Sequence, residues 1–444
     1  MIDLSPQAVA IAMTGGLLLG IASGFPLGLV LGGVAMVVGV LAWGPQVFSM
    51  FYDRLFGVLT EYTFLAVPLF IFMGIMVQKS GVSDKLFSAL HIWLGGFRGG
   101  LAIGTVLLGT ILAACVGVIA ASVTMLGLIA LPAMLNRGYS KELATGACCA
   151  GGTLGILIPP SIMIILYGPM ATISVGKLFM AAFIPGFILS ALYCTYIAVR
   201  CFTRPREGPA LPPSERTLPW SKKINMLLTS MVPPIFLVLA VLGSIFLGIA
   251  SPTEAAAVGA LASILLAAAY RSLSLRVVKE TAYTTMGTFS MVFVIVVGAS
   301  FFTGVFLRMG CGDVVAHLIT AMPGGKWGSF IIIQLIIFIL GMFIDWIGII
   351  MIMIPIVSPI VIELGFNPLW FAMMIIVNLQ MSFLSPPFAY AIFFLKGVTT
   401  PEMRIDSSHI IRGVIPFIGL IAIGLLLLIR FPQLILWLPS MMIK

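Results

Sequence analysis

Long apolar stretches separated by short polar segments run through the whole chain. Most are close to the length of about 20 residues that a helix needs to cross a bilayer. We see none of the short alternating segments that are typical of a membrane β-barrel. The pattern therefore predicts an all-α polytopic membrane protein. The predicted spans are residues 8–23, 26–43, 64–78, 99–136, 143–172, 178–199, 225–249, 254–270, 284–306, 327–364, 369–395 and 411–438.

Two of these stretches, 99–136 and 327–364, are nearly twice as long as one crossing requires. The middle of the first contains Gly117, and the middle of the second runs from Gly341 to Asp345. We interpret each stretch as a re-entrant hairpin, whose two helices enter and leave the membrane on the same side.

A shift of 227 positions places four helix-breaking residues of the first half on four of the second. The aligned pairs are Pro132 with Pro359, Gly138 with Gly365, Pro159 with Pro386 and Pro160 with Pro387. Proline removes a backbone donor and glycine tolerates unusual dihedral angles, so GGTLGILIPPS and NLQMSFLSPP are interpreted as unwound helices, at 151–160 and 378–387. Such matched interruptions are typical of secondary transporters built from inverted-topology repeats. The alternative is that these prolines only kink continuous helices.

Composition and charge agree with a membrane location. Of 444 residues, 61% are hydrophobic and 8% are charged, against about 25% charged in soluble domains. If both hairpins re-enter and every other span crosses once, 17 of the 23 Lys and Arg residues fall on one side, which is then cytoplasmic. The hairpins open toward opposite sides, so the two halves are inverted. The net charge of +9 follows from these loops and does not indicate a nucleic-acid partner.

The predicted hairpins divide the chain into a scaffold and a transport domain. A polar, proline-rich stretch at 201–223 is expected to form a flexible cytoplasmic linker. The expected parts are N-terminal scaffold helices at 1–98, the first half of the transport domain at 99–172, further scaffold helices with the linker at 173–326, the second half of the transport domain at 327–397, and a C-terminal helix at 398–444.

Unwound backbone carbonyls suit hard cations, and the exposed N-termini of half-helices favour anions. We therefore expect a site for a hard cation at each unwound segment, facing the hairpin tip of its own half, and a site for an anion at the half-helix N-termini. The candidate cation ligands are Gly117, Ser122, Gly151, Gly152, Thr153, Pro159, Asp345, Asn378, Gln380, Ser382 and Pro386. The candidate substrate-binding residues are Thr124, Ser161 and Ser385.

Two acids need separate interpretations. Asp345 is the only acid deep within a predicted span, and such acids are usually functional; the alternative is that it anchors the hairpin tip by hydrogen bonds. Glu254, three residues after Ser251, is interpreted as an acid that complements the dipole at a helix start. The cysteines and histidines form no metal-binding pattern, so no metal site is expected from these residues.

Several segments resemble the large membrane subunit of tripartite ATP-independent periplasmic (TRAP) transporters. They are LTEYTFLAVPLFIFMGIMVQKSG, LPAMLNRGY, GGTLGILIPPSIMIILYG, GIASPTEAAAVGA and GMFIDWIGIIMIMIPIVSPI. The resemblance implies an elevator-type secondary transporter of the bacterial inner membrane, driven by sodium and without an organic cofactor. It also implies a separate small four-helix membrane subunit, a periplasmic substrate-binding protein and a carboxylate substrate.

One departure from the family pattern concerns the tip of hairpin 1. Many members carry a serine-rich sequence close to SGSSVA, whereas residues 116–121 of this chain read VGVIAA. The missing hydroxyl groups imply either that the first cation site relies more on backbone carbonyls or that the substrate pocket is more apolar.

The predicted function is therefore sodium-coupled uptake of an organic acid by an elevator mechanism. The nearest alternative is a related ion-coupled organic-anion carrier that works without a binding protein. A membrane-embedded enzyme would need a catalytic constellation, and the spans offer one buried acid without a histidine partner. A channel would need a continuous polar lining, whereas the polar residues cluster in two central patches.

Overall fold

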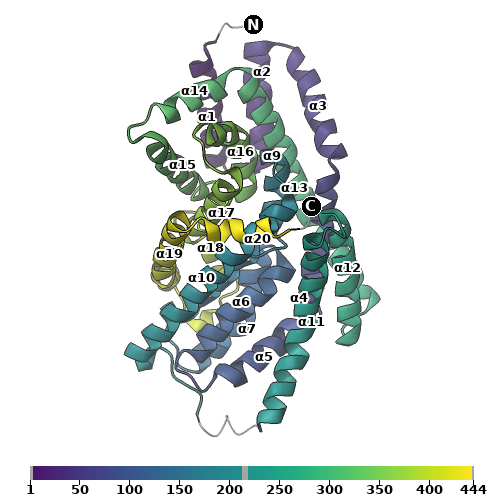
Figure 1. The fold of residues 1–444 in the computed structure, drawn as a ribbon, viewed down its shortest axis with the longest axis vertical. Coiled ribbons are helices and arrows are strands. Elements are labelled where there is room, and N and C mark those ends of the chain that lie inside the picture. The colour runs from purple at the N-terminus through teal and green to yellow at the C-terminus, as the bar shows by residue number, and fades with distance from the viewer. Residues whose placement is uncertain (1–3, 213–218, 443–444) are drawn as a thin grey trace.

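The computed structural model describes residues 4–212 and 219–442, and every regular element in these ranges is helical (Figure 1). The first half contains α1 (Pro6–Ala22), α2 (Leu27–Trp43), α3 (Gln46–Thr60), α4 (Ala66–Lys79), α5 (Val82–Leu94), α6 (Gly100–Val116), α7 (Ile119–Asn136), α8 (Lys141–Thr153), α9 (Ile162–Ala171) and α10 (Val175–Thr203). The second half contains α11 (Trp220–Phe246), α12 (Pro252–Ala269), α13 (Leu275–Arg308), α14 (Cys311–Thr320), α15 (Gly325–Gly341), α16 (Trp346–Glu363), α17 (Pro368–Leu384), α18 (Tyr390–Gly397), α19 (Ser407–Arg430) and α20 (Gln433–Ser440). Eight helices in the described part are long and apolar enough to cross a membrane, which agrees with the predicted all-α class.

The helix boundaries repeat with the same offset of 227 positions that relates the prolines. The offset carries Ile119 and Asn136, the ends of α7, onto Trp346 and Glu363, the ends of α16. Within a few residues it also relates α2 to α12, α6 to α15, α8 to α17 and α9 to α18. The single 34-residue helix α13 takes the place of both α3 and α4. The repeat read from glycines and prolines is thus a repeat of helices.

Both long apolar stretches form helical hairpins. The first turns between α6 and α7 at Gly117, whose φ of 65° suits glycine because it has no Cβ. The second turns between Gly341 and Trp346. In Figure 1 the hairpin α6–α7 lies in the lower half of the molecule and the hairpin α15–α16 in the upper half. The two hairpins therefore approach each other from opposite ends, as expected for inverted halves.

Each hairpin is followed by a helix that is interrupted at its Pro-Pro pair. After α8 the chain makes a 3₁₀ turn, η2 (Leu154–Ile156), and stays non-helical until Ser161. After α17 it is non-helical at 385–389. Both Pro-Pro peptide bonds are cis. The interruptions are real but shorter than predicted, because 151–153 and 378–384 are helical.

Close packing explains why α8 continues through its glycines. A Cβ on Gly152 would lie 2.4 Å from Cγ2 of Val123, and a Cβ on Gly109 would lie 2.5 Å from the carbonyl oxygen of Gly151. These glycines therefore let hairpin 1 approach α8, rather than unwinding it. The same argument does not apply to α17, where Asn378 and Ser382 donate hydrogen bonds to residues of α15.

The two halves are interlocked. α2 packs on α13 while α12 packs on α4, α9 packs on α16 while α18 packs on α7, and α8 packs on α19 while α10 packs on α17. Each pair takes one helix from each half. Two crossings depend on glycine: a Cβ on Gly298 would lie 2.2 Å from the carbonyl oxygen of Gly28, and one on Gly146 would lie 2.3 Å from that of Gly413. Small residues of this kind allow membrane helices to approach closely.

Hydropathy missed several helices and merged others. α3, α5 and α14 occupy segments that were expected to be loops, because amphipathic helices lack the continuous apolar run on which the prediction depended. The interpretation of Glu254 is confirmed: Ser251 and Glu254 form a capping box at the start of α12, in which the Glu254 carboxylate accepts a 2.7 Å hydrogen bond from the Ser251 N–H.

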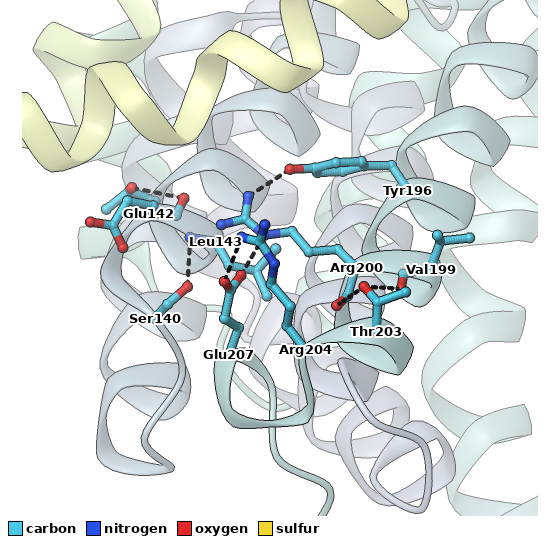
Figure 2. A network of polar contacts seen from close by, with 10 residues as sticks. Ser140, Glu142, Leu143, Tyr196, Val199, Arg200, Thr203, Arg204 and Glu207 are labelled. Atoms are coloured by element: carbon cyan, nitrogen blue, oxygen red, sulfur yellow. Dashed lines mark hydrogen bonds and ion pairs between the residues drawn. The ribbon is translucent and has the colours of Figure 1, made fainter.

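The described part of the linker between the halves is held by contacts. Figure 2 shows the Glu207 carboxylate accepting hydrogen bonds from Arg200 and Arg204. Partial burial raises the pKa of Glu207, but these hydrogen bonds and positive charges outweigh it, and the pKa lies below its ordinary value. The backbone N–H groups of Ser140 and Gly99 donate to the carbonyl oxygens of Glu207 and Gly208, each at 2.9 Å. This segment thus packs against the ends of hairpin 1 instead of forming a free loop; residues 213–218 of the predicted linker lie outside the described residues.

Candidate functional site

The two hairpin tips line one cavity of about 650 Å³. Tip 1 contributes residues 118–120 and tip 2 contributes residues 345–347. The start of α2 and the middle of α13 form another part of the wall. The remaining lining residues are Pro26, Leu27, Gly28, Leu29, Ile162, Thr288, Ser290, Met291, Val292, Val294, Ile295, Tyr390 and Phe394. The cavity therefore lies where both hairpins meet helices from the two halves of the chain.

Five helices begin at this cavity. Their first residues all line it: Leu27 of α2, Ile119 of α7, Ile162 of α9, Trp346 of α16 and Tyr390 of α18. The N-terminus of a helix carries a partial positive charge and unpaired N–H groups, so it attracts anions. The described residues of the cavity wall therefore offer an anion several helix N-termini and no basic side chain, and Asp345 is the one acid among them.

Tip 1 faces the interrupted helix of its own half, as predicted. A Cβ on Gly117 would lie 3.3 Å from the carbonyl oxygen of Pro160, and one on Gly155 would lie 2.5 Å from Oγ of Ser122. The Ser122 hydroxyl is buried and has no hydrogen-bond partner among the described residues. Gly117, Ser122 and the segment around Pro159 are thus brought together, with one buried hydroxyl group left over for a ligand.

Two other hydroxyl groups near the first interruption are already used. Thr153 Oγ1 donates to the carbonyl oxygen of Ala150 at 3.0 Å, and Ser161 Oγ donates to that of Ile156. Both side chains stabilise the chain on either side of the break, because they pair backbone carbonyls there.

Tip 2 also contacts the interruption of its own half. The N–H of Phe388 donates to the carbonyl oxygen of Met342 at 3.1 Å. A Cβ on Gly341 would lie 2.5 Å from Oγ of Ser382, and this hydroxyl donates to the carbonyl oxygen of Phe338 at 3.2 Å. The Asp345 carboxyl lies beside the Tyr390 hydroxyl and the N–H groups that open α16. Asp345 thus both lines the cavity and joins the tip to α18, so the two interpretations of this acid are compatible.

The amide side chains of α17 behave differently from one another. Asn378 Nδ2 donates to the backbone oxygen of Gln334 at 2.7 Å and to its Oε1 at 2.8 Å. Gln380 is completely buried, and neither its Oε1 nor its Nε2 has a hydrogen-bond partner in the described structure. Buried polar groups are normally paired, so this amide is free to pair with an ion or a water molecule.

The remaining predicted site residues lie around these clusters. Gly151 and Gly152 are helical and pack against hairpin 1, while Pro386 lies in the second interruption and Ser385 donates to the carbonyl oxygen of Met381 at 2.8 Å. Thr124, Ser161 and Ser385 are not among the residues that line the cavity, and their role in substrate binding stays a prediction. No cluster of three or more His, Cys, Asp or Glu residues occurs in the described ranges.

Sequence reasoning missed part of the site. Tyr390 could have been suspected from its position just beyond the second Pro-Pro pair, and Gln334 is the one amide in the apolar run 327–340. The walls from α2 and α13 had no such signal, because they reach the cavity only through packing between distant parts of the chain.

A search against protein families gives a match over almost the whole chain. The model described as tripartite ATP-independent periplasmic transporter, DctM component, matches residues 14–434. The chain belongs to this family. The resemblance stated from the sequence motifs is therefore confirmed, and this DctM-family chain is a large TRAP permease subunit and a multi-pass protein of the inner membrane.

Relatives of this DctM-family chain are permeases rather than enzymes. The C4-dicarboxylate TRAP transporter large permease protein DctM of Pseudomonas aeruginosa is 30% identical over 413 residues, covering 92% of this chain and 93% of that protein. The ectoine/5-hydroxyectoine permease UehC of Ruegeria pomeroyi is 29% identical, covering 85% of this chain and 86% of that protein. The solved YdaH transporter of Alcanivorax borkumensis shares the fold, with a TM-score of 0.64, 15% identity, and coverage of 96% of this chain and 99% of that one.

Proposed function

We propose that this permease carries out sodium-coupled uptake of a carboxylate, by an elevator movement of one group of helices against another. The observation that carries the proposal is the convergence of two hairpin tips and two interrupted helices on one cavity. Many secondary transporters are built from inverted halves with interrupted helices at matching positions. They bind substrate and coupling ions at these interruptions, where the two halves meet.

The packing supports a division into a moving group and a scaffold. α10 packs on α6 and α17, and α19 packs on α8 and α17, so we assign α10 and α19 to the moving group together with both re-entrant hairpins and both interrupted helices. The scaffold consists of α1–α4 and α11–α13, joined by the pairs α2–α13 and α4–α12. This grouping differs from the sequence expectation, which placed α10 with the scaffold helices of 173–326. The cavity lies between the groups, because α2 and α13 form its outer wall.

We place one sodium ion between each hairpin tip and its interruption. At the first site the oxygen donors are Ser122 and backbone carbonyls near Gly117 and Pro159; at the second they come from the neighbourhood of Asp345, Gln380 and Pro386. Sodium held between a tip and a break ties the two together, so the hairpin closes over substrate only when the ion is bound. The unpaired Ser122 hydroxyl and the unpaired Gln380 amide support this placement.

The partners and substrate class are proposed from the family and its relatives. The family name describes a tripartite, periplasmic system, so we propose a small membrane subunit on another chain and a periplasmic substrate-binding protein. Relatives are named for C4-dicarboxylates, sialic acid and ectoine, and all of these carry a carboxylate. The helix N-termini at the cavity are suited to this group.

The test is uptake into proteoliposomes that contain the permease, its small subunit and its binding protein loaded with radiolabelled substrate. We expect accumulation with an inward sodium gradient and none with potassium in its place. Equal uptake without sodium would refute the coupling. Uptake that is unchanged when the binding protein is omitted would instead favour the related carrier that works alone.

A further inference from the structure

The cavity wall is built mainly from branched and aromatic side chains, which come from both tips, both post-interruption helices, α2 and α13. Ile119, Ile162 and Ile347 line it from α7, α9 and α16, and each is no more than 3% exposed. Phe394 of α18 and Met291 of α13 complete this surface. A substrate that fits between the tips therefore meets hydrocarbon on several sides.

The unusual tip of hairpin 1 is part of this wall. In the stretch where many family members have serines, this chain has Val116, Val118 and Ile119. Val118 and Ile119 line the cavity, whereas the backbone of Val116 packs against α4, since a Cβ on Gly74 would lie 2.6 Å from its carbonyl oxygen. Of the two alternatives left open by the sequence, the structure thus favours a more apolar substrate pocket.

A second anionic group on the substrate would find no basic side chain in the described wall of this cavity. Among the described residues that line it there is no Lys, Arg or His, and the one charged side chain is the acid Asp345. One carboxylate can be held by the helix N-termini and by bound sodium. A second carboxylate on the same molecule would lose its hydration without a cationic partner and would be repelled by Asp345.

Hydroxyl groups elsewhere on a substrate would also find few hydrogen-bond partners in the cavity wall. The hydroxyl groups at the wall are those of Thr288, Ser290 and Tyr390, and Tyr390 lies beside Asp345. A substrate with several hydroxyl groups would leave most of them facing Val, Ile and Phe side chains, which costs free energy for each unpaired group.

We propose that the cavity selects a monocarboxylate with a branched aliphatic or aromatic body and discriminates against dicarboxylates and sugar acids. The proposal rests on the proposed function, because it takes the cavity between the tips as the substrate site. Val118 and Ile119 are the specificity-determining residues at tip 1.

The test is ligand-dependent thermal stabilisation of the purified, full-length permease in detergent, in sodium and in potassium. The probes are phenylacetate, isocaproate, succinate and gluconate. In sodium we expect phenylacetate and isocaproate to raise the unfolding midpoint with apparent affinities at least about tenfold tighter than the other two, because a carboxylate or hydroxyl group left unpaired in the cavity weakens binding by about that factor. Succinate or gluconate binding as tightly as phenylacetate would overturn the proposal, and so would stabilisation by none of the four acids.

Single substitutions distinguish an effect of tip 1 on substrate selectivity from a general effect on folding. Val118→Ser and Ile119→Ser are expected to weaken phenylacetate about tenfold or more relative to succinate, while Leu128→Ser, at a side chain that is 59% exposed on the same helix, leaves the ratio unchanged. Val118→Thr nearly preserves shape and serves if the serine variant does not fold. An unchanged ratio in every tip variant contradicts the proposal. Stabilisation by phenylacetate that is equal in sodium and potassium would count against sodium coupling, while leaving the selectivity intact.

Discussion

Replacing Gln380 with leucine tests the second cation site most directly. The side chain is completely buried on α17, and both of its amide atoms lack a hydrogen-bond partner within the described structure. Leucine has a similar size and no polar atoms, so the substitution removes the amide with little change in packing.

The expected free energies have opposite signs in the two salts. An unpaired buried polar group costs about 1–3 kcal/mol, so without sodium Gln380→Leu should be at least as stable as the parent protein. Binding of an ion to the folded state stabilises it by about 2.7 kcal/mol when the ion is present at 100 times its Kd. The parent should gain stability of this order in saturating sodium, and the variant should lose the part of that gain that depends on Gln380.

The assay is thermal unfolding of the purified protein in matched sodium and potassium buffers. Tyr193→Phe is the control, because the Tyr193 hydroxyl on α10 is also fully buried and unpaired in the described structure, yet lies in a contact with Phe417. It should leave the sodium-dependent gain intact. If Gln380→Leu retains the full gain in sodium, Gln380 is not a cation ligand and the second site must be placed elsewhere.

Three further predictions concern stability. Gly146→Ala should lower the free energy of unfolding by about 1–3 kcal/mol, measured by chemical denaturation, because its Cβ would lie 2.3 Å from the Gly413 carbonyl oxygen where α8 crosses α19. Glu207 has a lowered pKa, so its contribution is fully present above the ordinary value of 4.5 and is lost as the pH falls through the lower folded-state pKa; Glu207→Gln should flatten the acid-side decline in the unfolding midpoint. Ser251→Ala removes the capping serine of α12 and should cost about 1 kcal/mol in the same denaturation assay.

Each of these predictions has a control or a contradicting result. Gly419→Ala on α19 places its Cβ in open space and should leave the free energy of unfolding nearly unchanged. If it lowers this free energy as much as Gly146→Ala does, the effect of Gly146→Ala does not come from the close approach of α8 and α19. If the unfolding midpoint of Glu207→Gln falls at acid pH as steeply as that of the parent protein, the contacts of Glu207 with Arg200 and Arg204 are not the source of the decline. Ser251→Thr keeps a capping hydroxyl, and it should restore most of the loss seen with alanine.

The hairpins and the repeat could be predicted from sequence because their signals are local. Gly117 marks a turn that needs a positive φ, and the Pro-Pro pairs remove the donors that a continuous helix would use. Both signals act through the backbone of the residue itself. The repeat adds a second, independent copy of each signal, which is why the boundaries of α7 and α16 agree to the residue.

The extent of the interruptions could not be predicted, because it depends on the neighbouring helices. Gly151 stays helical because hairpin 1 passes within contact of its backbone, and Asn378 stays helical because Gln334 on α15 satisfies its amide. Glycine and asparagine have the same intrinsic preferences whether or not such a neighbour exists. The cavity walls from α2 and α13 were missed for the same reason, since nothing local to Pro26 or Thr288 points to a site.

The exchange of partners between the halves bears on how such a chain is made. While the first half is still the only part synthesised, α2 lacks α13 and α4 lacks α12, so its final packing must wait until the second half has entered the bilayer. An isolated half would expose these faces to lipid, and two copies inserted in opposite directions could cover each other. The covalent linker thus keeps beside each half the partner helices that its own packing requires.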